Sequence, residues 1–215
     1  MGGCLLPAAD SALAVSVSWR QGYTMQGMAV RSLAAGVPLG GTGRLQALYR
    51  NSGADYREQQ AVLGYRMAVA QWLTLGVFGT YSHIGTSDPH YRPQQWIDAG
   101  AVALLRAGRT GAYLAAGSRR WDSRRPWMLV AGASWRPVRS LLAVAEVSAM
   151  DATRLRCGME YTYDGRCSAR AGFATAPLVL TFGVGYRQAR YSIDLSTEVH
   201  RTLGLTPQLS LGLCL

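Results

Sequence analysis

Apolar and polar residues alternate with a period of two along the C-terminal segment 178–215. In 191–200, the odd positions are Tyr191, Ile193, Leu195, Thr197 and Val199, and the even positions are Ser192, Asp194, Ser196, Glu198 and His200. The segments 178–186 and 209–215 repeat this pattern. A period of two indicates β-strands with two unlike faces. Successive strands of this kind are typical of a transmembrane β-barrel, which presents an apolar face to lipid and a polar face to its lumen.

The same alternation runs through the rest of the chain from Ser11, interrupted by turn-forming segments such as 40–43. It predicts an all-β fold, a transmembrane antiparallel β-barrel of about fourteen strands. An even number of strands places both ends of the chain on the same side of the membrane. One strand, 139–148, is ambiguous because 141–144 is apolar on both faces. We expect residues 11–215 to form a single barrel domain, preceded by a short segment at 1–10.

The connections between these strands fall into two groups of different length. With both termini periplasmic, the longer connections all lie on the extracellular side, at 51–55, 85–93, 119–126, 149–152 and 201–206. The shorter ones all lie on the periplasmic side, at 39–41, 70–71, 107–108, 137–138, 164–166 and 188–189. Short periplasmic turns and longer outer loops are typical of outer-membrane barrels. The sequence therefore predicts a location in the outer membrane of a Gram-negative cell, among outer-membrane lipids.

Composition favours a membrane barrel over a soluble one. Charged residues make up 16% of the chain, below the roughly 25% that is usual in soluble proteins. No apolar run reaches the roughly 18 residues of a membrane-spanning helix, so the bilayer would be crossed by strands. The alternative, a soluble barrel with an apolar interior, would have to fill that interior with small residues. Aromatic residues near the expected strand ends are typical of interfacial girdles, and these are Trp19, Trp135, Tyr163, Tyr186 and Tyr191.

The basic residues are all arginine, and the net charge is +10. The arginines recur at inward strand positions and in loops rather than on one helix or patch, which argues against nucleic acid as a partner. Anionic lipid head groups match such loop charge better, and solvated loop charge without a specific partner is the simplest alternative. The most polar loop is our candidate for an extracellular contact, through Arg119, Arg120, Trp121, Arg124 and Arg125.

Charged residues of both signs occupy positions that face the expected lumen. They form the set of candidate site residues: Arg44, Arg66, Arg154, Arg156, Glu160, Arg170, Arg187, Arg190, Asp194 and Glu198. Opposite charges on neighbouring strands satisfy one another in a partly dehydrated interior, so the favoured interpretation is a salt-bridged filling of the lumen. The alternative is a selective lining for anionic solutes. Secretion-system or surface-protein partners would contact the barrel elsewhere, at an exposed loop or at the outer wall.

No pattern in the sequence indicates catalysis, a metal ion or a cofactor. The three histidines, His83, His90 and His200, are dispersed, and none has a second ligand at metal-binding spacing. No local signature surrounds a candidate nucleophile. We therefore expect a non-enzymatic protein without a cofactor.

Two of the four cysteines flank the hairpin around 164–166. Keeping the apolar faces aligned pairs Tyr163 with Cys167 and Cys157 with Phe173. The two cysteines then lie about 20 Å apart along the sheet, whereas a disulfide requires Cα atoms within about 7 Å. We expect free thiols that act as small apolar fillers.

Residues 1–10 lack a basic n-region and a long apolar h-region, so they do not read as a signal peptide. An outer-membrane barrel needs such a signal for export. Either the sequence begins after the signal, or translation starts further upstream.

Several stretches resemble the PorV/PorQ-type outer-membrane proteins of Bacteroidetes, which are distant relatives of the fatty-acid transporter FadL. These stretches are 55–59, 135–137, 157–161 and the run from 170–173 through 182–185 to the closing strands. The resemblance covers most of 11–215 and implies a FadL-like barrel without enzymatic activity. It also implies an accessory role beside the type IX secretion translocon or its cell-surface attachment complex. No individual functional residue is carried over.

We therefore expect an accessory or binding component of protein transport by type IX secretion. The alternative is a FadL-like channel for hydrophobic or small anionic compounds. Two features depart from the FadL pattern. The glycine-rich N-terminal plug is absent or reduced to residues 1–10, and the last residue is Leu215 where an aromatic residue is usual.

Overall fold

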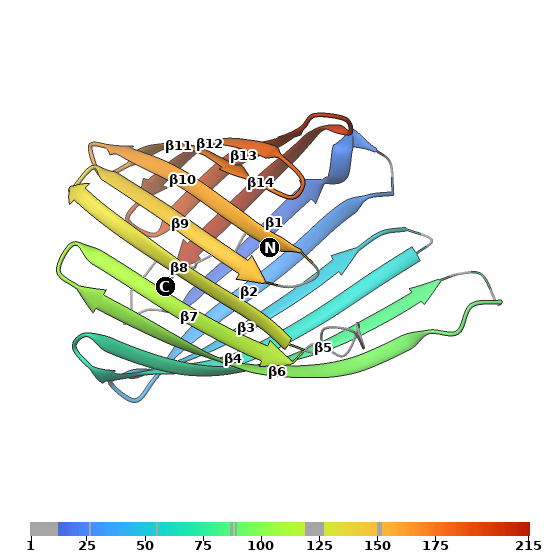
Figure 1. Cartoon of the computed structure of the whole chain (residues 1–215), viewed down its shortest axis with the longest axis horizontal. Helices are drawn as coiled ribbons and strands as arrows, with labels where there is room; N and C mark the ends of the chain where they lie inside the picture. The colour runs from blue at the N-terminus through green and yellow to red at the C-terminus, as the bar shows by residue number, and fades with distance from the viewer. Residues whose placement is uncertain are drawn as a thin grey trace.

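The structure, a computed structural model, describes residues 13–25, 27–54, 56–86, 88, 90–118, 127–149 and 152–215. Within these residues fourteen antiparallel strands form a closed barrel, in which each strand pairs with the next and β1 pairs with β14 (Figure 1). The strands are β1 (Ala14–Gln21), β2 (Ala29–Leu39), β3 (Gly43–Ser52), β4 (Tyr56–Ala70), β5 (Leu73–Thr86), β6 (Gln94–Ala107), β7 (Thr110–Ser118), β8 (Trp127–Val138), β9 (Leu141–Ala149), β10 (Thr153–Tyr163), β11 (Cys167–Ala174), β12 (Val179–Gln188), β13 (Tyr191–His200) and β14 (Gly204–Cys214). The predicted fourteen-stranded barrel is confirmed.

The two rims of the barrel differ in the length of their connections. Six connections of two or three residues lie at the rim where β1 begins and β14 ends, which we call the turn rim. The opposite rim, the loop rim, carries η1 (Gly22–Thr24) and the loops 87–93 and 119–126. Three connections expected to be longer, 53–55, 150–152 and 201–203, span three residues each, because β3 continues to Ser52, β9 continues to Ala149 and β14 begins at Gly204. The sorting of long and short connections agrees with the sequence pattern.

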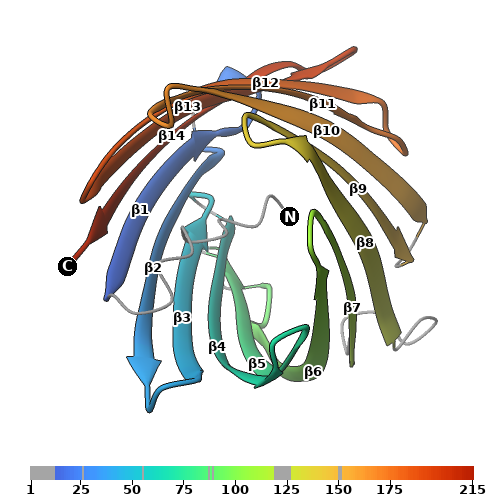
Figure 2. The same cartoon turned by 90° about the vertical axis from the view of Figure 1, so that its left-hand side faces the viewer.

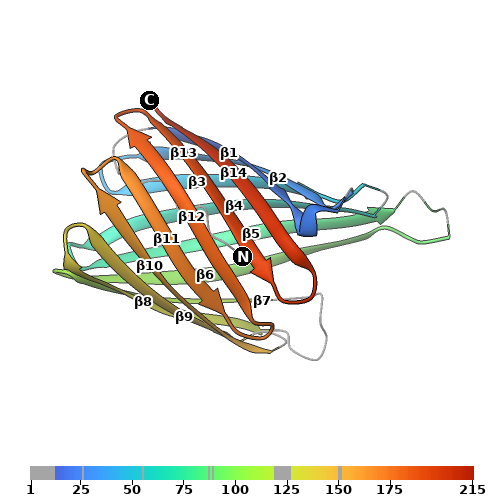
Figure 3. The same cartoon turned by 90° about the horizontal axis from the view of Figure 1, so that it is seen from above.

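The barrel is uneven along its circumference. Strands β4, β5 and β6 have 15, 14 and 14 residues, whereas β1 and β11 have 8 each. As a result, the β5–β6 hairpin extends beyond the loop rim (Figure 3). Register shifts interrupt the ladder between Ala68 and Ala70 and between Trp135 and Val138. Both irregularities lie near the turn rim, where bulges bend a strand toward its hairpin.

The strands have an exposed apolar outer face and a half-buried inner face. In β13, for example, Leu195 on the outer face is 53% exposed, and its neighbours Asp194 and Ser196 are half-buried on the inner face. Among the described residues only Ala14 and Ala34 are fully buried apolar side chains. A soluble barrel of this size would need a packed apolar interior. The apolar outer face is therefore the lipid face, and the inner face lines the lumen, as in other transmembrane barrels.

Aromatic side chains ring the outer surface near both rims. Near the turn rim, large exposed fractions belong to Trp72, Trp135, Tyr163, Tyr186 and Tyr191. Near the loop rim, exposed outer aromatics are Trp19, Tyr49, Tyr81 and Trp127. In β8, Trp127 and Trp135 lie one at each end of the strand, about 26 Å apart along a strand of ordinary rise. With a typical tilt this separation matches an apolar band of about 25 Å or slightly less. The predicted girdle residues lie in these two belts.

The hairpin at 164–166 has the register expected from its apolar faces. Tyr163 pairs with Cys167 and Cys157 pairs with Phe173. Cys157, Cys167 and Cys214 are free. The faces of β9, ambiguous in the sequence, are resolved by pairing: Glu146 lies opposite Arg156 on the lumen side.

Within the described chain, the helical content is too short and too polar to form a membrane-spanning helix.

Candidate functional site: the barrel lumen

The lumen is a ring of half-exposed inner side chains rather than a packed core. Figure 2 looks into the barrel from the turn rim, where β10–β14 form one side of the ring and β4–β7 the other. The side chains that form ion pairs on β1 and on β9–β13 are between 26% and 37% exposed. Groups exposed to this extent inside a closed ring of strands contact water in the lumen. Solutes small enough to enter would therefore meet these side chains directly.

One side of the lumen, which we call the charged wall, is organised around Arg170 on β11. Its Nε donates to Glu160 Oε2 on β10 at 2.7 Å, and its Nη2 donates to Asp194 Oδ1 on β13 at 2.6 Å. Glu160 and Arg170 are direct cross-strand partners, whereas Asp194 lies two strands away. The guanidinium reaches it across β12 because Gly183 and Gly185 carry no side chains there. Charge-assisted bonds of this kind are among the stronger hydrogen bonds in proteins.

Gly185 is required by this arrangement. A Cβ at that position would overlap the Asp194 carboxylate and the Ser168 hydroxyl and would lie 3.2 Å from Arg170 Nη2. The two acidic residues neutralise the arginine, which keeps the guanidinium against the wall instead of across the lumen.

A second group on the charged wall joins β7, β9 and β10. The Nη1 of Arg156 donates to Glu146 Oε1, and the hydroxyl of Tyr113 donates to Glu146 Oε2. Glu146 pairs with Arg156 on one side and with Gly132 on the other. The carboxylate therefore has a partner at each oxygen, and this group marks the boundary between the charged wall and the next strands.

A third ion pair closes the barrel near the loop rim. Arg20 Nη2 on β1 lies 2.6 Å from Glu198 Oε2 on β13, so the pair spans β14. Nearby, η1 is fixed by a hydrogen bond from Tyr23 N to Thr206 Oγ1 at 3.0 Å. The Tyr23 and His200 rings meet edge to face at 6.0 Å. These contacts fasten the first strand to the last two.

The remaining candidate arginines of the predicted set occupy three different settings. Arg44 and Arg66 are cross-strand partners on the inner face of β3 and β4, and Arg44 is buried. Arg154 donates from Nε and Nη2 to Ala176 O at the loop rim, at 3.1 and 2.9 Å. Arg187 is the penultimate residue of β12 and Arg190 lies in the β12–β13 turn, both exposed at the turn rim. The structure thus brings Arg156, Glu160, Arg170, Asp194 and Glu198 into ion pairs and places Arg187 and Arg190 at the rim.

The opposite side of the lumen, β5–β8, has an apolar middle with polar residues such as Thr80, Ser82 and Asp98 toward the loop rim, and we call it the apolar wall. Inner residues of neighbouring strands in this wall are cross-strand partners of one another, and so are the outer residues. Val102, Ala115 and Val130 form one continuous row of cross-strand partners. Phe78 and Leu104 extend this surface along β5 and β6. The acidic residue of the apolar wall is Asp98 on β6, and its basic residue is Arg106, exposed at the turn rim.

Large inner side chains lie flat against the wall over glycines of neighbouring strands. A Cβ at Gly132 would overlap the Tyr113 ring, and one at Gly100 would overlap the Phe78 ring. A Cβ at Gly36 would lie 2.9 Å from the Arg44 guanidinium. An aromatic side chain that covers a cross-strand glycine is a recurrent device in barrels. Here it keeps bulky groups out of the middle of the lumen.

Three residues of the ion-pair groups were absent from the predicted set: Arg20, Tyr113 and Glu146. Glu146 was missed because its strand is apolar on both faces over 141–144, so parity gave no inward assignment. A signal was present, since Glu146 has the same inward parity as Ser148 once β9 is aligned with β10. Tyr113 reads as an ordinary barrel aromatic, and only the ring position over Gly132 reveals its bond to Glu146.

The loop candidates Arg119, Arg120, Trp121, Arg124 and Arg125 lie outside the described residues. Across the described ranges, no cluster of histidine, cysteine, aspartate or glutamate side chains has the geometry of a metal site.

The comparisons with known proteins agree with this architecture. No family model matches the chain, and no curated protein matches it. Among solved structures, the Acinetobacter baumannii outer membrane protein Omp33 superposes with a TM-score of 0.67 at 9% identity, covering 95% of this chain and 98% of that one. The CymD monoaromatic hydrocarbon channel gives 0.62 at 11% identity, with coverage of 94% and 86%. A mutant of the Rh. blastica porin gives 0.56 at 7% identity, with coverage of 95% and 99%. At these identities the likeness concerns the fold, and the chain has the outer-membrane β-barrel fold.

Proposed function

We propose that this protein is a passive, non-enzymatic channel of the Gram-negative outer membrane for small amphipathic solutes. The observation that carries the proposal is the contrast between the two lumen walls. A solute with an apolar body and a polar or anionic head can lay its body along Val102, Ala115 and Val130 while its head faces the charged wall. Channels orient permeating molecules by such lining groups.

The pairing of charges supports passage rather than tight binding. Arg156 and Arg170 are already neutralised by Glu146, Glu160 and Asp194. A permeating anion would find weak, shared contacts there instead of a free arginine. Conduction requires binding that is favourable enough for entry and weak enough for exit. The sequence offered two interpretations of the charged residues, ion pairs that fill the lumen and a selective lining for anionic solutes. The proposal uses both, because the paired charges would line the path of the solute.

The known channels among the structural neighbours give a chemical class for the first trials. CymD is described as a monoaromatic hydrocarbon channel. A monoaromatic carboxylate has the apolar body and anionic head that the two walls would accommodate. We propose this class as the solute for the present chain.

The test is reconstitution into planar bilayers and liposomes. We expect steady single-channel conductance, together with faster entry of an aromatic carboxylate than of a sugar alcohol of similar size. Replacing Val102 and Val130 with serine should reduce the preference for the aromatic solute and leave salt conductance largely unchanged. The matched control is Ala131→Ser on the lipid face of the same strand. A silent barrel that is folded, as judged by heat-modifiable migration on a gel, would refute the channel.

The accessory role implied by the PorV/PorQ resemblance remains a prediction. It requires partners in secretion or surface attachment, with the loop 119–126 or the outer wall as the contact. A deletion strain distinguishes the two functions, because loss of a channel should slow solute uptake and leave secreted proteins unaffected. Altered secretion with normal uptake would favour the accessory role.

A further inference from the structure

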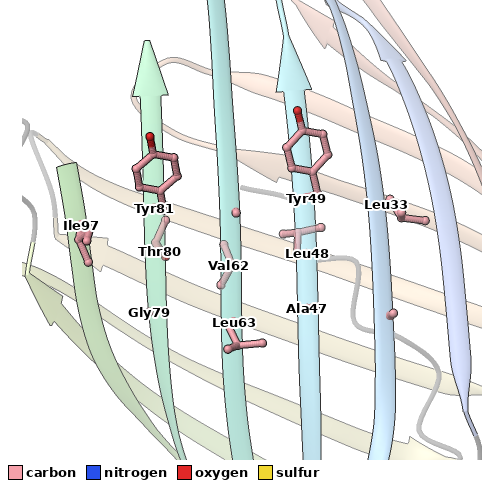
Figure 4. A pocket seen from close by; sticks show the side chains of 12 residues that line it. Leu33, Ala47, Leu48, Tyr49, Val62, Leu63, Gly79, Thr80, Tyr81 and Ile97 are labelled. Atoms are coloured by element: carbon pink, nitrogen blue, oxygen red, sulfur yellow. The ribbon is translucent and has the colours of Figure 1, made fainter. Parts of the chain in front are cut away.

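An apolar hollow of about 500 Å³ lies on the outer face of β2–β6. Figure 4 shows it from outside the barrel, with the opposite wall behind it. Its floor consists of residues with little or no side chain: Ala35, Ala47, Ala61 and Gly79. Larger side chains stand around this floor, namely Leu33, Tyr49, Leu63, Tyr81 and Ile97.

The register explains why the wall is hollowed at this point. Leu33, Tyr49, Ala61, Tyr81 and Ile97 form one row of cross-strand partners over β2–β6. Ala61 leaves a gap between the two tyrosines of this row. The next row toward the turn rim is Ala35, Ala47, Leu63 and Gly79, in which Leu63 stands between small residues on both sides. Small residues are therefore adjacent within a row and between rows, which opens a hollow in an otherwise even lipid-facing surface.

The loop-rim edge of this hollow is polar and basic. The next outer-face row is Arg31, Asn51, Gln59, His83 and Gln95, about 7 Å further along the strands. Arg57 lies one position beyond, opposite Gly85. In Figure 4 the hydroxyls of Tyr49 and Tyr81 point toward the ends of β3 and β5, which are at this edge. The change from apolar to polar marks the membrane interface.

Among the described outer-face residues of β2–β6, the charge at this edge has one sign. Both described acidic residues of β2–β6, Glu58 and Asp98, alternate onto the lumen face. Arg31 and Arg57 are exposed on the outer face. Arg57 uses its Nε for Ala54 O at 3.1 Å, which leaves its other guanidinium donors free to face an anion. Two arginines above an apolar hollow match a lipid whose phosphate lies at the interface and whose chains lie below it.

We propose that this surface is a binding site for an anionic glycerophospholipid. The acyl chains lie in the hollow over Ala47, Ala61 and Gly79, and the phosphate is held by Arg31 and Arg57. The hollow has the volume of a site for one small ligand, which suits the tail of one phospholipid better than the many-chained anchor of a lipopolysaccharide. The site is on the outside of the barrel, so the proposal is independent of whether the lumen conducts.

The experiment uses the full chain, purified in detergent and stripped of lipid, with phosphatidylglycerol as the probe and native mass spectrometry as the readout. We expect one phosphatidylglycerol per barrel. Ala61→Phe, which fills the hollow, should weaken retention about tenfold, as expected when the apolar contacts of one site are lost. Ala131→Phe, on the outer face of β8, is the matched control and should retain the lipid. Heat-modifiable migration confirms that each variant is folded.

A second pair of measurements separates the head from the tail. Arg31→Ala and Arg57→Ala should weaken phosphatidylglycerol and leave a diacylglycerol with the same chains unaffected, whereas Ala61→Phe should weaken both. Three results would overturn the proposal: equal retention in wild type and Ala61→Phe, a clear preference for lipid A, or a dimer that Ala61→Phe dissociates. The last result would assign the hollow to a second copy of the chain.

Discussion

The strands of the apolar wall and those of the charged wall have the same kind of apolar outer face. Their inner faces differ. Leu114 on β7 and Leu195 on β13 are both mid-strand residues exposed on the outside. Their inner neighbours differ, since Ala115 faces Val102 and Val130, whereas Ser196 lies between Asp194 and Glu198. The lipid dictates the outer residues in the same way around the whole ring. The inner residues are free of that constraint, so the two walls can differ there.

The two walls also differ in how polar side chains that leave bulk water are partnered. On the charged wall, Glu146, Glu160 and Asp194 each form an ion pair with an arginine of a nearby strand. In the middle of the apolar wall, Val102, Ala115 and Val130 have no polar side-chain group to satisfy. A half-hydrated lumen allows both solutions, because neither a bare apolar surface nor a paired charge is strongly penalised there.

The largest effect should come from placing arginine on the two faces of each wall. Leu195→Arg and Leu114→Arg, both lipid-facing, should each lower the free energy of unfolding by about 2–4 kcal/mol. Ser196→Arg should be tolerated, because acidic neighbours and lumen water surround it. Ala115→Arg should be intermediate, because it faces valines. Urea unfolding in lipid vesicles measures all four variants, and equal losses for Leu195→Arg and Ser196→Arg would contradict the assignment of the faces.

A smaller effect is expected from breaking the ion-pair centre of the charged wall. Arg170→Ala leaves Glu160 and Asp194 facing each other without their cation. Because these side chains are about one third exposed to lumen water, the loss should be about 1–2 kcal/mol rather than the larger value of a fully buried pair. Urea unfolding is again the measurement.

The control for this variant removes all three charges. Arg170→Ala combined with Glu160→Gln and Asp194→Asn should recover part of the lost stability, because no unpaired carboxylate remains. If Arg170→Ala is as stable as the wild type, the network does not stabilise the wall.

The position of the Tyr113 ring against the apolar wall can be tested by substituting Gly132, which lies beneath it. Gly132→Val should displace the Tyr113 ring, which lies over Gly132, with a cost of about 1–3 kcal/mol from overpacking. The displaced ring would enter the lumen and lower single-channel conductance. Gly64 on β4 is the matched control, because a Cβ there meets only ordinary contacts at 3.4 Å or more. Adding Tyr113→Ala to Gly132→Val should restore conductance, and failure to do so would show that the ring is not the obstruction.

The contrast between the walls also explains which parts of the protein were predictable from sequence. Strand positions and the hairpin register at Tyr163 and Cys167 follow from lipid contact, which enforces apolar residues at alternate positions. The charged wall was equally readable because its polar residues alternate cleanly. One strand, β9, was ambiguous because it is apolar on both faces over 141–144. The ambiguity of β9 left Glu146 without an assigned face. Arg190 was expected on the lumen wall, but it lies in the two-residue turn at the rim.

The pairing of partners was not predictable either. Parity places Arg170 and Asp194 on one face, but their contact depends on Gly183 and Gly185 leaving β12 bare between them. Ring closure between β1 and β14 brings Arg20 to Glu198, 178 positions apart in the chain. Contacts across several strands need the barrel's curvature, which the alternation of residues does not encode.

The smallest effect concerns the loops above the two walls, which are fastened by different chemistry. Above the apolar wall, the backbone N–H of His90 donates to Asp88 Oδ1 at 2.9 Å. This hydrogen bond, with a second one from the His90 ring, lowers the pKa of the Asp88 carboxyl below its ordinary value. Above the charged wall, Arg154 donates to the carbonyl of Ala176, and neither partner is a carboxyl group.

Acid should therefore loosen the first loop and spare the second. The Asp88 contribution is fully present above the ordinary carboxyl pKa and is lost as the pH falls through the lowered one. Hydrogen exchange, corrected for its intrinsic pH dependence, should show the protection of the His90 amide decreasing below about pH 4, while Ala176 and its neighbours stay unchanged. Asp88→Asn is the control, since its amide oxygen accepts the bond without titrating and should remove the pH dependence. Because Asp88 is fully exposed, global stability should not change, and a parallel loss of protection in both loops would indicate unfolding of the rim instead of titration of one carboxyl group.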